Sequence, residues 1–421
     1  MNPSIRLTTL ANGLRIASDT MDTVESVAVG IWIDVGARDE DAAVNGASHF
    51  LEHLVFKGTV RRDARAIAEE IEAVGGHLNA HTSREYTAYY AKVLKEDVAL
   101  AVDILTDIVR NAVLDPREVD RERSVIVQEI LQALDTPDDI VFDRFQETAF
   151  PDQPLGRPVL GSVDGIRALP QGALAAYRDR HYSARRMVVV AAGRIEHDRL
   201  VDLVADRLGD LPATVAPARQ PARYTGGDCR DDRDLEQVNV ILGWEGVSFT
   251  DPDFYPLSVM ATLLGGGMSS RLFQEVREKR GLVYSIYTFP TSYLDDGLFG
   301  IYAGTGSEEV AEVVALICDE TLRMLTDVTD AEVARSRAQL KAGILMALES
   351  PSARCEQLAR QLLVFGRPLP LSEIINDIAA VDRESVLRVT RRLLAHPPTL
   401  TAIGPLGRLP DLAEVADRLR I

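Results

Sequence analysis

The chain has 421 residues, which is more than one ordinary hydrophobic core serves, so we expect two or three domains. With 46% hydrophobic and 26% charged residues, its composition is that of a soluble globular protein. The formal net charge of -18 argues against a nucleic-acid partner, because phosphate recognition needs a basic surface. Neither a long apolar stretch nor a secretory signal pattern is present, so no membrane span is predicted and a cytoplasmic protein is expected.

The N-terminal part of the chain begins with a strand pattern. Apolar residues at every second position through 27–35 predict a strand with one buried face. A helix should follow, with Asn45 as a plausible N-cap and Gly58 as a plausible end. A second helix is expected within 63–74, before a pair of glycines. Strands and helices are thus mixed from the start.

The elements that follow continue this mixture. Residues 77–94 are rich in Thr and Tyr and are typical of two strands joined by a turn. An amphipathic helix is predicted within 95–114, and another in 115–134, where Asp115 is the N-cap and Pro116 the first helical residue. Because strands and helices do not alternate strictly, the pattern favours an α+β fold over a doubly wound parallel sheet.

The second half of the chain repeats the order of the first. A strand pattern at 235–246, a helix pattern at 255–267 and another at 311–325 resemble early elements in the same order. Between the halves lies a segment rich in Pro, Gly and charge. We therefore predict two divergent copies of one unit of about 210 residues. The predicted boundaries are an N-terminal domain at 1–212, a linker at 213–235 and a C-terminal domain at 236–421.

Residues 46–59, GASHFLEHLVFKGT, carry the strongest functional signal. On a helix His49, Glu52 and His53 project from one face, and such a cluster is costly to bury unless it binds something. Two imidazoles one turn apart suit a divalent metal, usually zinc, and Glu52 is placed to act on water at the metal. The motif is the inverted order of His-Glu-x-x-His. The competing interpretation is a structural histidine pair whose side chains hydrogen bond to neighbouring groups, and from the motif alone it accounts for roughly one case in ten.

A zinc site of this kind needs a third protein ligand. The helix after Asp115 offers Glu118, Glu122 and Glu129, of which the last two are two turns apart on one face. Spacing does not choose among these three carboxylates, and a solvated surface charge is the commoner role for any of them.

These residues carry a resemblance to a known family. The motif His49-Phe50-Leu51-Glu52-His53, followed 76 residues later by Glu129, resembles the pitrilysin and mitochondrial processing peptidase family of inverted zinc metallopeptidases. Further similar segments are GGHLNAHTS, LGRPVLGSVDGIRAL and GGGMSSRLFQEVREKRGLVYSI. The resemblance covers nearly the whole chain and is strongest to the short, two-domain subgroup related to the β subunit. It implies two homologous α/β-roll domains of the LuxS and processing peptidase type, each a mainly antiparallel sheet packed with helices.

The resemblance also implies roles for the residues of the first half. His49, His53 and Glu129 would bind one zinc ion per chain, Glu52 would be the general base, and Glu122 would be a carboxylate beside the site.

Further implied roles concern the substrate. Arg277 and Tyr284 of the second half would contact it, although composition alone suggests a surface residue for Arg277 and a core aromatic for Tyr284. Asn79 and Ala80 would lie on an edge strand to which an extended peptide adds, and the nearby His81 is not expected to be a ligand.

The leading functional hypothesis is therefore a zinc endopeptidase that cuts unfolded peptides or presequence-like segments. Because the chain carries both the zinc motif and the glycine-rich loop at 265–267, which the mitochondrial enzyme divides between two subunits, a homodimer is expected. The alternative is a non-catalytic or partner-dependent subunit with the same fold. A zinc hydrolase acting on another kind of bond comes third, since the ligand set does not fix the bond that is cut.

Overall fold

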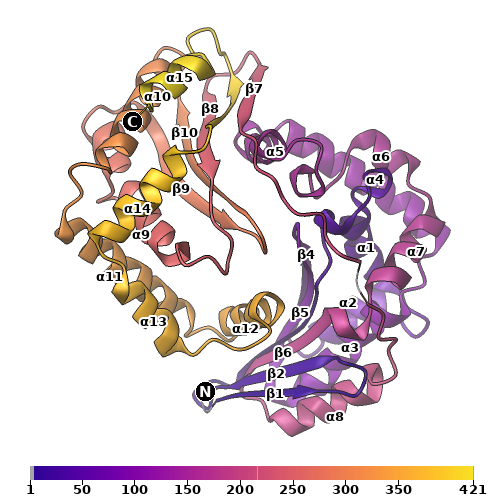
Figure 1. The fold of residues 1–421 in the computed structure, drawn as a ribbon. Helices are drawn as coiled ribbons and strands as arrows, with labels where there is room; N and C mark the ends of the chain where they lie inside the picture. The colour runs from indigo at the N-terminus through magenta and orange to yellow at the C-terminus, as the bar shows by residue number, and fades with distance from the viewer. Residues whose placement is uncertain (1–3, 216, 421) are drawn as a thin grey trace. The chain divides into compact units, whose positions relative to one another are not determined.

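The computed structural model describes residues 4–215 and 217–420, which form two compact units (Figure 1). The first unit consists of Met1–Leu131, Arg157–Gln220 and Leu345–Pro370. The second consists of Gln132–Gly156, Pro221–Ile344 and Leu371–Ile421. Each unit is therefore assembled from segments that are far apart in the sequence.

The first unit is built on a six-stranded sheet. In spatial order its strands are β1 (Ile5–Thr9), β2 (Arg15–Thr20), β6 (Met187–Gly193), β3 (Ser26–Ile33), β5 (Thr87–Leu94) and β4 (His77–Thr82). All neighbours are antiparallel except the parallel pair of β2 and β6. The predicted early strand is confirmed as β3, and the predicted pair of strands as β4 and β5. Strand β4 lies at the edge of the sheet.

The four helices predicted in the first unit are present as α1 to α4, and one predicted cap is wrong. The helices of this unit are α1 (Ala47–Val55), α2 (Ala64–Glu72), α3 (Val98–Asn111), most of α4 (Pro116–Leu134), α6 (Val163–Ala168), α7 (Gln171–His181), α8 (His197–Leu208) and α12 (Pro351–Phe365). The prediction of Asn45 as the N-cap of α1 is wrong, because Gly46 occupies that position with φ +94°. The Asn45 side chain instead donates a hydrogen bond to Glu40.

The second unit contains a five-stranded sheet. Its strands, in spatial order, are β7 (Gly227–Asp232), β11 (Thr399–Gly404), β8 (Val238–Glu245), β10 (Gly297–Thr305) and β9 (Val283–Ser292). Only β7 and β11 are parallel to each other. Its helices are α5 (Pro137–Ala149), α9 (Phe254–Gly265), α10 (Val310–Arg323), α11 (Asp330–Ala347, which ends in the first unit), α13 (Leu371–Ala380), α14 (Arg383–Leu394) and α15 (Leu412–Arg418).

The two sheets share one topology, which supports the predicted internal repeat. The order β2-β6-β3-β5-β4 of the first unit corresponds to β7-β11-β8-β10-β9 of the second. In the first unit the last strand, β6, lies between β2 and β3, and the hairpin of β4 and β5 forms the far edge. In the second unit the last strand, β11, lies between β7 and β8, and the hairpin of β9 and β10 forms the far edge. The architecture is the expected α+β arrangement of mainly antiparallel sheets packed with helices.

Each unit also contains one helix from the other half of the sequence. Helix α12 packs on β2, β3 and β6 of the first unit (Figure 1). Its Leu358 and Leu362 belong to the same buried cluster as Trp32 of β3. Helix α5 packs on β7, β8 and β11 of the second unit. The predicted domain boundaries at 212 and 236 do not account for this exchange of helices. Strand β7 lies within the segment that was expected to be a linker. In the described part of the chain no helix is both long and apolar enough to cross a membrane.

Candidate metal centre

The N-terminus of α1 is held in place by a buried carboxylate. Glu40 accepts hydrogen bonds from the backbone N–H groups of Gly46 and Ser48, both at 2.7 Å. These donors have no partner within the helix, so the carboxylate acts as a cap that the preceding segment supplies. Burial raises the pKa of Glu40 to about 7. Glycine is favoured at position 46, since its φ is +94° and a Cβ there would lie 2.9 Å from the backbone oxygen of Leu160.

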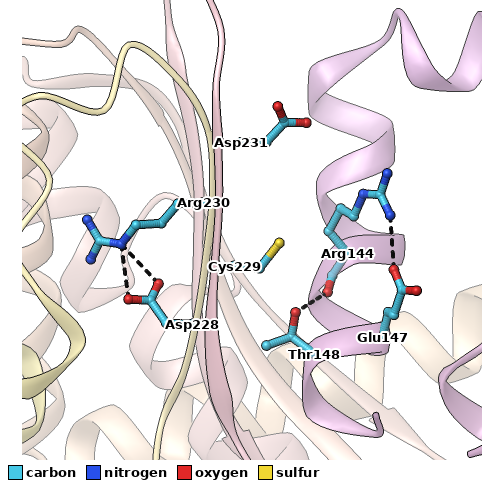
Figure 2. Close-up of a pocket in the computed structure, with 7 residues that line it drawn as sticks. All are labelled: Arg144, Glu147, Thr148, Asp228, Cys229, Arg230 and Asp231. Carbon is cyan, nitrogen blue, oxygen red and sulfur yellow. Dashed lines mark hydrogen bonds and ion pairs between the residues drawn. The ribbon is translucent and has the colours of Figure 1, made fainter. Parts of the chain in front are cut away.

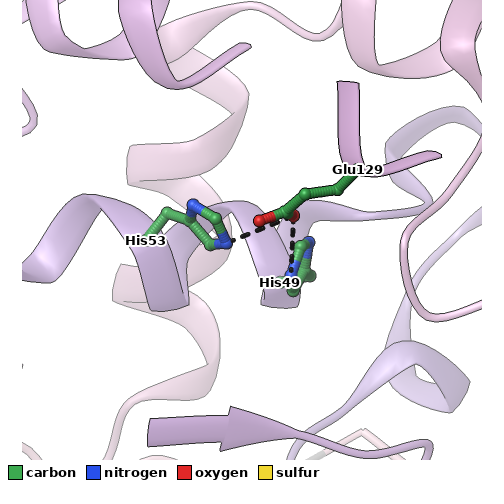
Figure 3. A group of neighbouring side chains, drawn as sticks. All are labelled: His49, His53 and Glu129. Carbon is green, nitrogen blue, oxygen red and sulfur yellow. Dashed lines mark ion pairs between the residues drawn. The ribbon is translucent and has the colours of Figure 1, made fainter. Parts of the chain in front are cut away.

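Helices α1 and α4 bring three potential metal ligands together (Figure 3). The Nε2 atoms of His49 and His53 lie 3.7 and 3.5 Å from Oε2 of Glu129. Of the residues that the structure describes, these are the one group of three or more His, Cys, Asp or Glu side chains placed to hold a metal ion. The three residues predicted from the sequence as ligands are therefore adjacent in space.

The surroundings of His49 favour a neutral imidazole. Its side chain is almost completely buried, with 9% of the residue exposed. Burial, followed by the nearby His53, lowers the pKa of His49 to about 4. A neutral imidazole is the form that binds a metal, because one ring nitrogen then keeps its lone pair.

Glu52 lies on the same helix and has a different partner. Its Oε2 atom accepts a hydrogen bond of 2.6 Å from the hydroxyl of Thr82, at the end of β4. Burial raises the pKa of Glu52, and the charge of Glu129 acts in the same direction, while Thr82 opposes them. Glu52 is thus close to the three candidate ligands and is not a member of their group.

Glu122 lies beside the His53 ring. It is 2% exposed and lies on α4, two turns before Glu129. Its Oε2 atom is 3.1 Å from Nδ1 of His53, and its Oε1 atom is 2.8 Å from Nζ of Lys57. A His53 ring that donates from Nδ1 keeps the lone pair of Nε2 directed toward Glu129. The third candidate, Glu118, instead pairs with Arg121 near the start of the helix.

Two partners at this site were not found from the sequence. Lys57 is four residues after His53, and this spacing on a helix could have suggested a shared face. Thr82 carries no such signal, because it reaches Glu52 only through the packing of β4 against α1.

The predicted peptide-binding residues lie on the edge strand. Asn79 and Ala80 are in the middle of β4, whose one hydrogen-bonded neighbour within the described sheet is β5. Asn79 is exposed. His81 packs edge-on against the rings of Tyr86 and Tyr90 and does not belong to the ligand group.

Arg277 and Tyr284 form a separate cluster in the second unit. Arg277 lies in a π-helical turn, Phe273–Glu278, and Tyr284 is the second residue of β9. The Arg277 guanidinium is 4.8 Å from the centre of the Phe273 ring and 5.3 Å from that of Tyr284. Tyr284 is 78% exposed, so the composition-based expectation of a core aromatic is wrong. An exposed phenol beside a guanidinium is available to a ligand.

The second unit also has a cavity of about 410 Å³ between α5 and β7 (Figure 2). Its charged side chains pair with one another: Arg144 with Glu147 and Arg230 with Asp228, each at 3.0 Å. Burial raises the pKa of the Cys229 thiol, which disfavours a reactive thiolate. The cavity therefore offers no catalytic group comparable to the cluster on α1 and α4.

Family models match both halves of the chain. The family described as insulinase, peptidase family M16, matches residues 15–163, and the peptidase M16 inactive domain matches residues 169–340. The chain belongs to peptidase family M16. All the candidate ligands lie in the first matched region, and both Arg277 and Tyr284 lie in the second.

Relatives of similar length support this assignment. An uncharacterized zinc protease of Streptomyces coelicolor is 41% identical over 413 residues, which cover 96% of this chain and 90% of the relative. The mitochondrial-processing peptidase subunit beta of Homo sapiens is 38% identical over 432 residues, which cover 99% and 88%.

Solved structures share the fold. A protease from Helicobacter pylori has a TM-score of 0.88 at 23% identity and covers 95% of this chain and 99% of its own. A chain of Complex III2 from Candida albicans with Inz-5 bound has a TM-score of 0.90 at 22% identity, with coverage of 99% and 100%.

Proposed function

We propose that this chain is a zinc-dependent endopeptidase that hydrolyses unfolded peptides or presequence-like segments. The observation that carries the proposal is the convergence of His49, His53 and Glu129, with Glu52 beside them on the same helix. The names of the relatives, zinc protease and mitochondrial-processing peptidase subunit beta, support the same reaction class.

The ligand atoms fit zinc in kind and in spacing. Zinc sites with catalytic roles commonly use three protein ligands drawn from histidine and carboxylate side chains and keep a fourth position open. With bonds of about 2.0–2.1 Å, the ligand atoms of a tetrahedral site lie about 3.3–3.4 Å apart. The separations of 3.5 and 3.7 Å between the imidazoles and Glu129 are close to this value. We therefore propose one zinc ion per chain, bound by these three residues.

When bound, zinc would supply a Lewis acid that polarises the scissile carbonyl and activates water. We propose that Glu52 takes the proton from the attacking water and later gives it to the leaving amine. Glu122 keeps His53 in the orientation that directs Nε2 toward Glu129. Lys57 contacts the other oxygen of Glu122 and compensates its buried charge.

The substrate is proposed to lie as an added strand along β4. The edge of β4 presents backbone groups near Asn79 and Ala80, where the N–H of Ala80 donates to Oδ1 of Asn79 at 2.8 Å in this structure. An extended peptide pairs with such an edge whatever its side chains. Arg277 and Tyr284 are proposed to donate hydrogen bonds to the substrate, because both are donors suited to an oxyanion.

Cleavage of a quenched fluorescent peptide rich in Arg tests the proposal. Purified protein should cleave it, a zinc chelator such as 1,10-phenanthroline should abolish cleavage, and added zinc should restore it. Added magnesium serves as the control and should restore nothing, because it prefers oxygen ligands. Cleavage that persists after zinc has been removed would contradict a zinc peptidase. An inactive, zinc-loaded chain that gains activity with a second protein would favour the partner-dependent subunit instead.

We also propose that the chain acts as a homodimer, because it carries both the zinc motif and the Arg277 and Tyr284 cluster. Light scattering coupled to size-exclusion chromatography should give twice the 46.2 kDa of one chain. A mass of one chain for an active sample would rule the homodimer out.

A further inference from the structure

Thr82 is the last residue of β4 and contacts the metal-site helix. Its backbone pairs with Thr87 of β5, which fixes its place in the sheet. Its hydroxyl is the donor in the 2.6 Å hydrogen bond to Oε2 of Glu52. This length falls in the range of about 2.5–2.7 Å that is typical of strong hydrogen bonds to a carboxylate. The contact therefore links the proposed peptide-binding strand to the proposed base.

Two of the phenol groups near Glu52 are already occupied. The phenol groups of Tyr89 and Tyr182 lie in the same buried region, where they hydrogen bond to each other at 2.8 Å. Among the residues that the structure describes, Thr82 supplies the side-chain hydrogen bond to Glu52, and the backbone of Thr82 also hydrogen bonds to this carboxylate. A glutamate side chain has three rotatable bonds, so a donor that the sheet holds in a fixed place, such as the Thr82 hydroxyl, affects where its carboxylate lies.

We propose that Thr82 is a positioning residue for Glu52. By donating to Oε2, it holds the carboxylate so that Oε1 is left for proton transfer. Because Thr82 also belongs to β4, the base keeps a fixed place relative to the strand on which the peptide would lie. The inference rests on the proposed function, in which Glu52 is the general base.

The variants Thr82→Val and Thr82→Ser test the hydrogen bond. Valine has the shape of threonine without the donor, whereas serine keeps the donor. In Thr82→Val we expect kcat for the Arg-rich peptide to fall about 10- to 100-fold, because a displaced catalytic group costs about that much. KM and zinc content should change less than about twofold, since neither peptide pairing nor the ligands are altered. Thr82→Ser should keep most of the wild-type kcat.

A matched control is Thr9→Val. Thr9 is likewise the last residue of an edge strand, β1, and it is exposed. This variant should leave kcat unchanged. If Thr82→Val keeps full activity, or if Thr82→Ser is as impaired as Thr82→Val, the role proposed for the hydroxyl is wrong.

Two further measurements separate this inference from the proposed function. A crystal structure of metal-free Thr82→Val should show the Glu52 carboxylate displaced, and an unmoved carboxylate would overturn the inference even if no cleavable peptide were known. An active Glu52→Gln protein would refute Glu52 as the base. If Glu52→Gln is inactive while Thr82→Val is fully active, only the role of Thr82 fails.

Discussion

Glu52→Gln protein is expected to bind zinc as the wild type does and to lose peptide cleavage by about 10²- to 10⁴-fold. The amide keeps the size and the hydrogen-bonding capacity of the side chain, but it cannot accept the proton of the attacking water. Zinc should be retained because Glu52 lies outside the ligand group of His49, His53 and Glu129. The measurement is kcat/KM for the quenched peptide, with the zinc content of the same sample.

The matched control for this variant is Glu69→Gln. Glu69 is exposed on α2, where it pairs with Arg65 four residues earlier, and its substitution should leave cleavage within about twofold of wild type. If Glu52→Gln retained wild-type cleavage, the proton would have to be taken by another group.

Glu129→Ala is expected to weaken zinc binding by roughly 100- to 1000-fold, because a binding free energy of about 10–16 kcal/mol is divided among few ligands. Glu129 is partly exposed on α4, so the fold should tolerate the change. Zinc affinity can be measured by competition with a chromogenic chelator. Thermal unfolding provides a second measurement, because zinc should raise the Tm of the wild type and have little effect on the variant.

The control for the ligand variant comes from the same helix. Glu118 contacts Arg121 and lies outside the ligand group, so Glu118→Ala should bind zinc with wild-type affinity. Equal affinity of Glu129→Ala and the wild type would mean that the third ligand is a different residue.

The sequence predicts the local part of this site well. The spacing of His49 and His53 is sufficient to place both rings on one helical face, because helix geometry alone determines it. The third candidate ligand could not be predicted in the same way. Glu118, Glu122 and Glu129 are all on α4, and only the packing of α4 against α1 shows which of them lies beside the two histidines. The family resemblance pointed to Glu129 in advance, and the pattern of residues did not.

Contacts between elements that are distant in the sequence could not be predicted. The bond from Thr82 to Glu52 depends on how β4 packs beside α1. The cap of α1 comes from Glu40, whereas the sequence pattern favours Asn45, because Asn is a preferred N-cap residue and lies near the start of the helix.

The exchange of α5 and α12 has a similar origin. An apolar stripe shows that a helix is buried on one side, but it does not indicate which sheet the helix covers. The apolar side chains of Leu358 and Leu362 show that one face of α12 is buried, but they do not show against which sheet. In the structure they pack on the sheet of the first unit, and α12 therefore belongs to that unit.

The most direct test of the central claim is the location of zinc in a crystal of the zinc-loaded protein by anomalous X-ray scattering. The account predicts one zinc ion per chain, with Nε2 of His49, Nε2 of His53 and the carboxylate of Glu129 within about 2.0–2.2 Å of it. Zinc bound by other side chains, or absent from the helix that bears His49 and His53, would contradict the account.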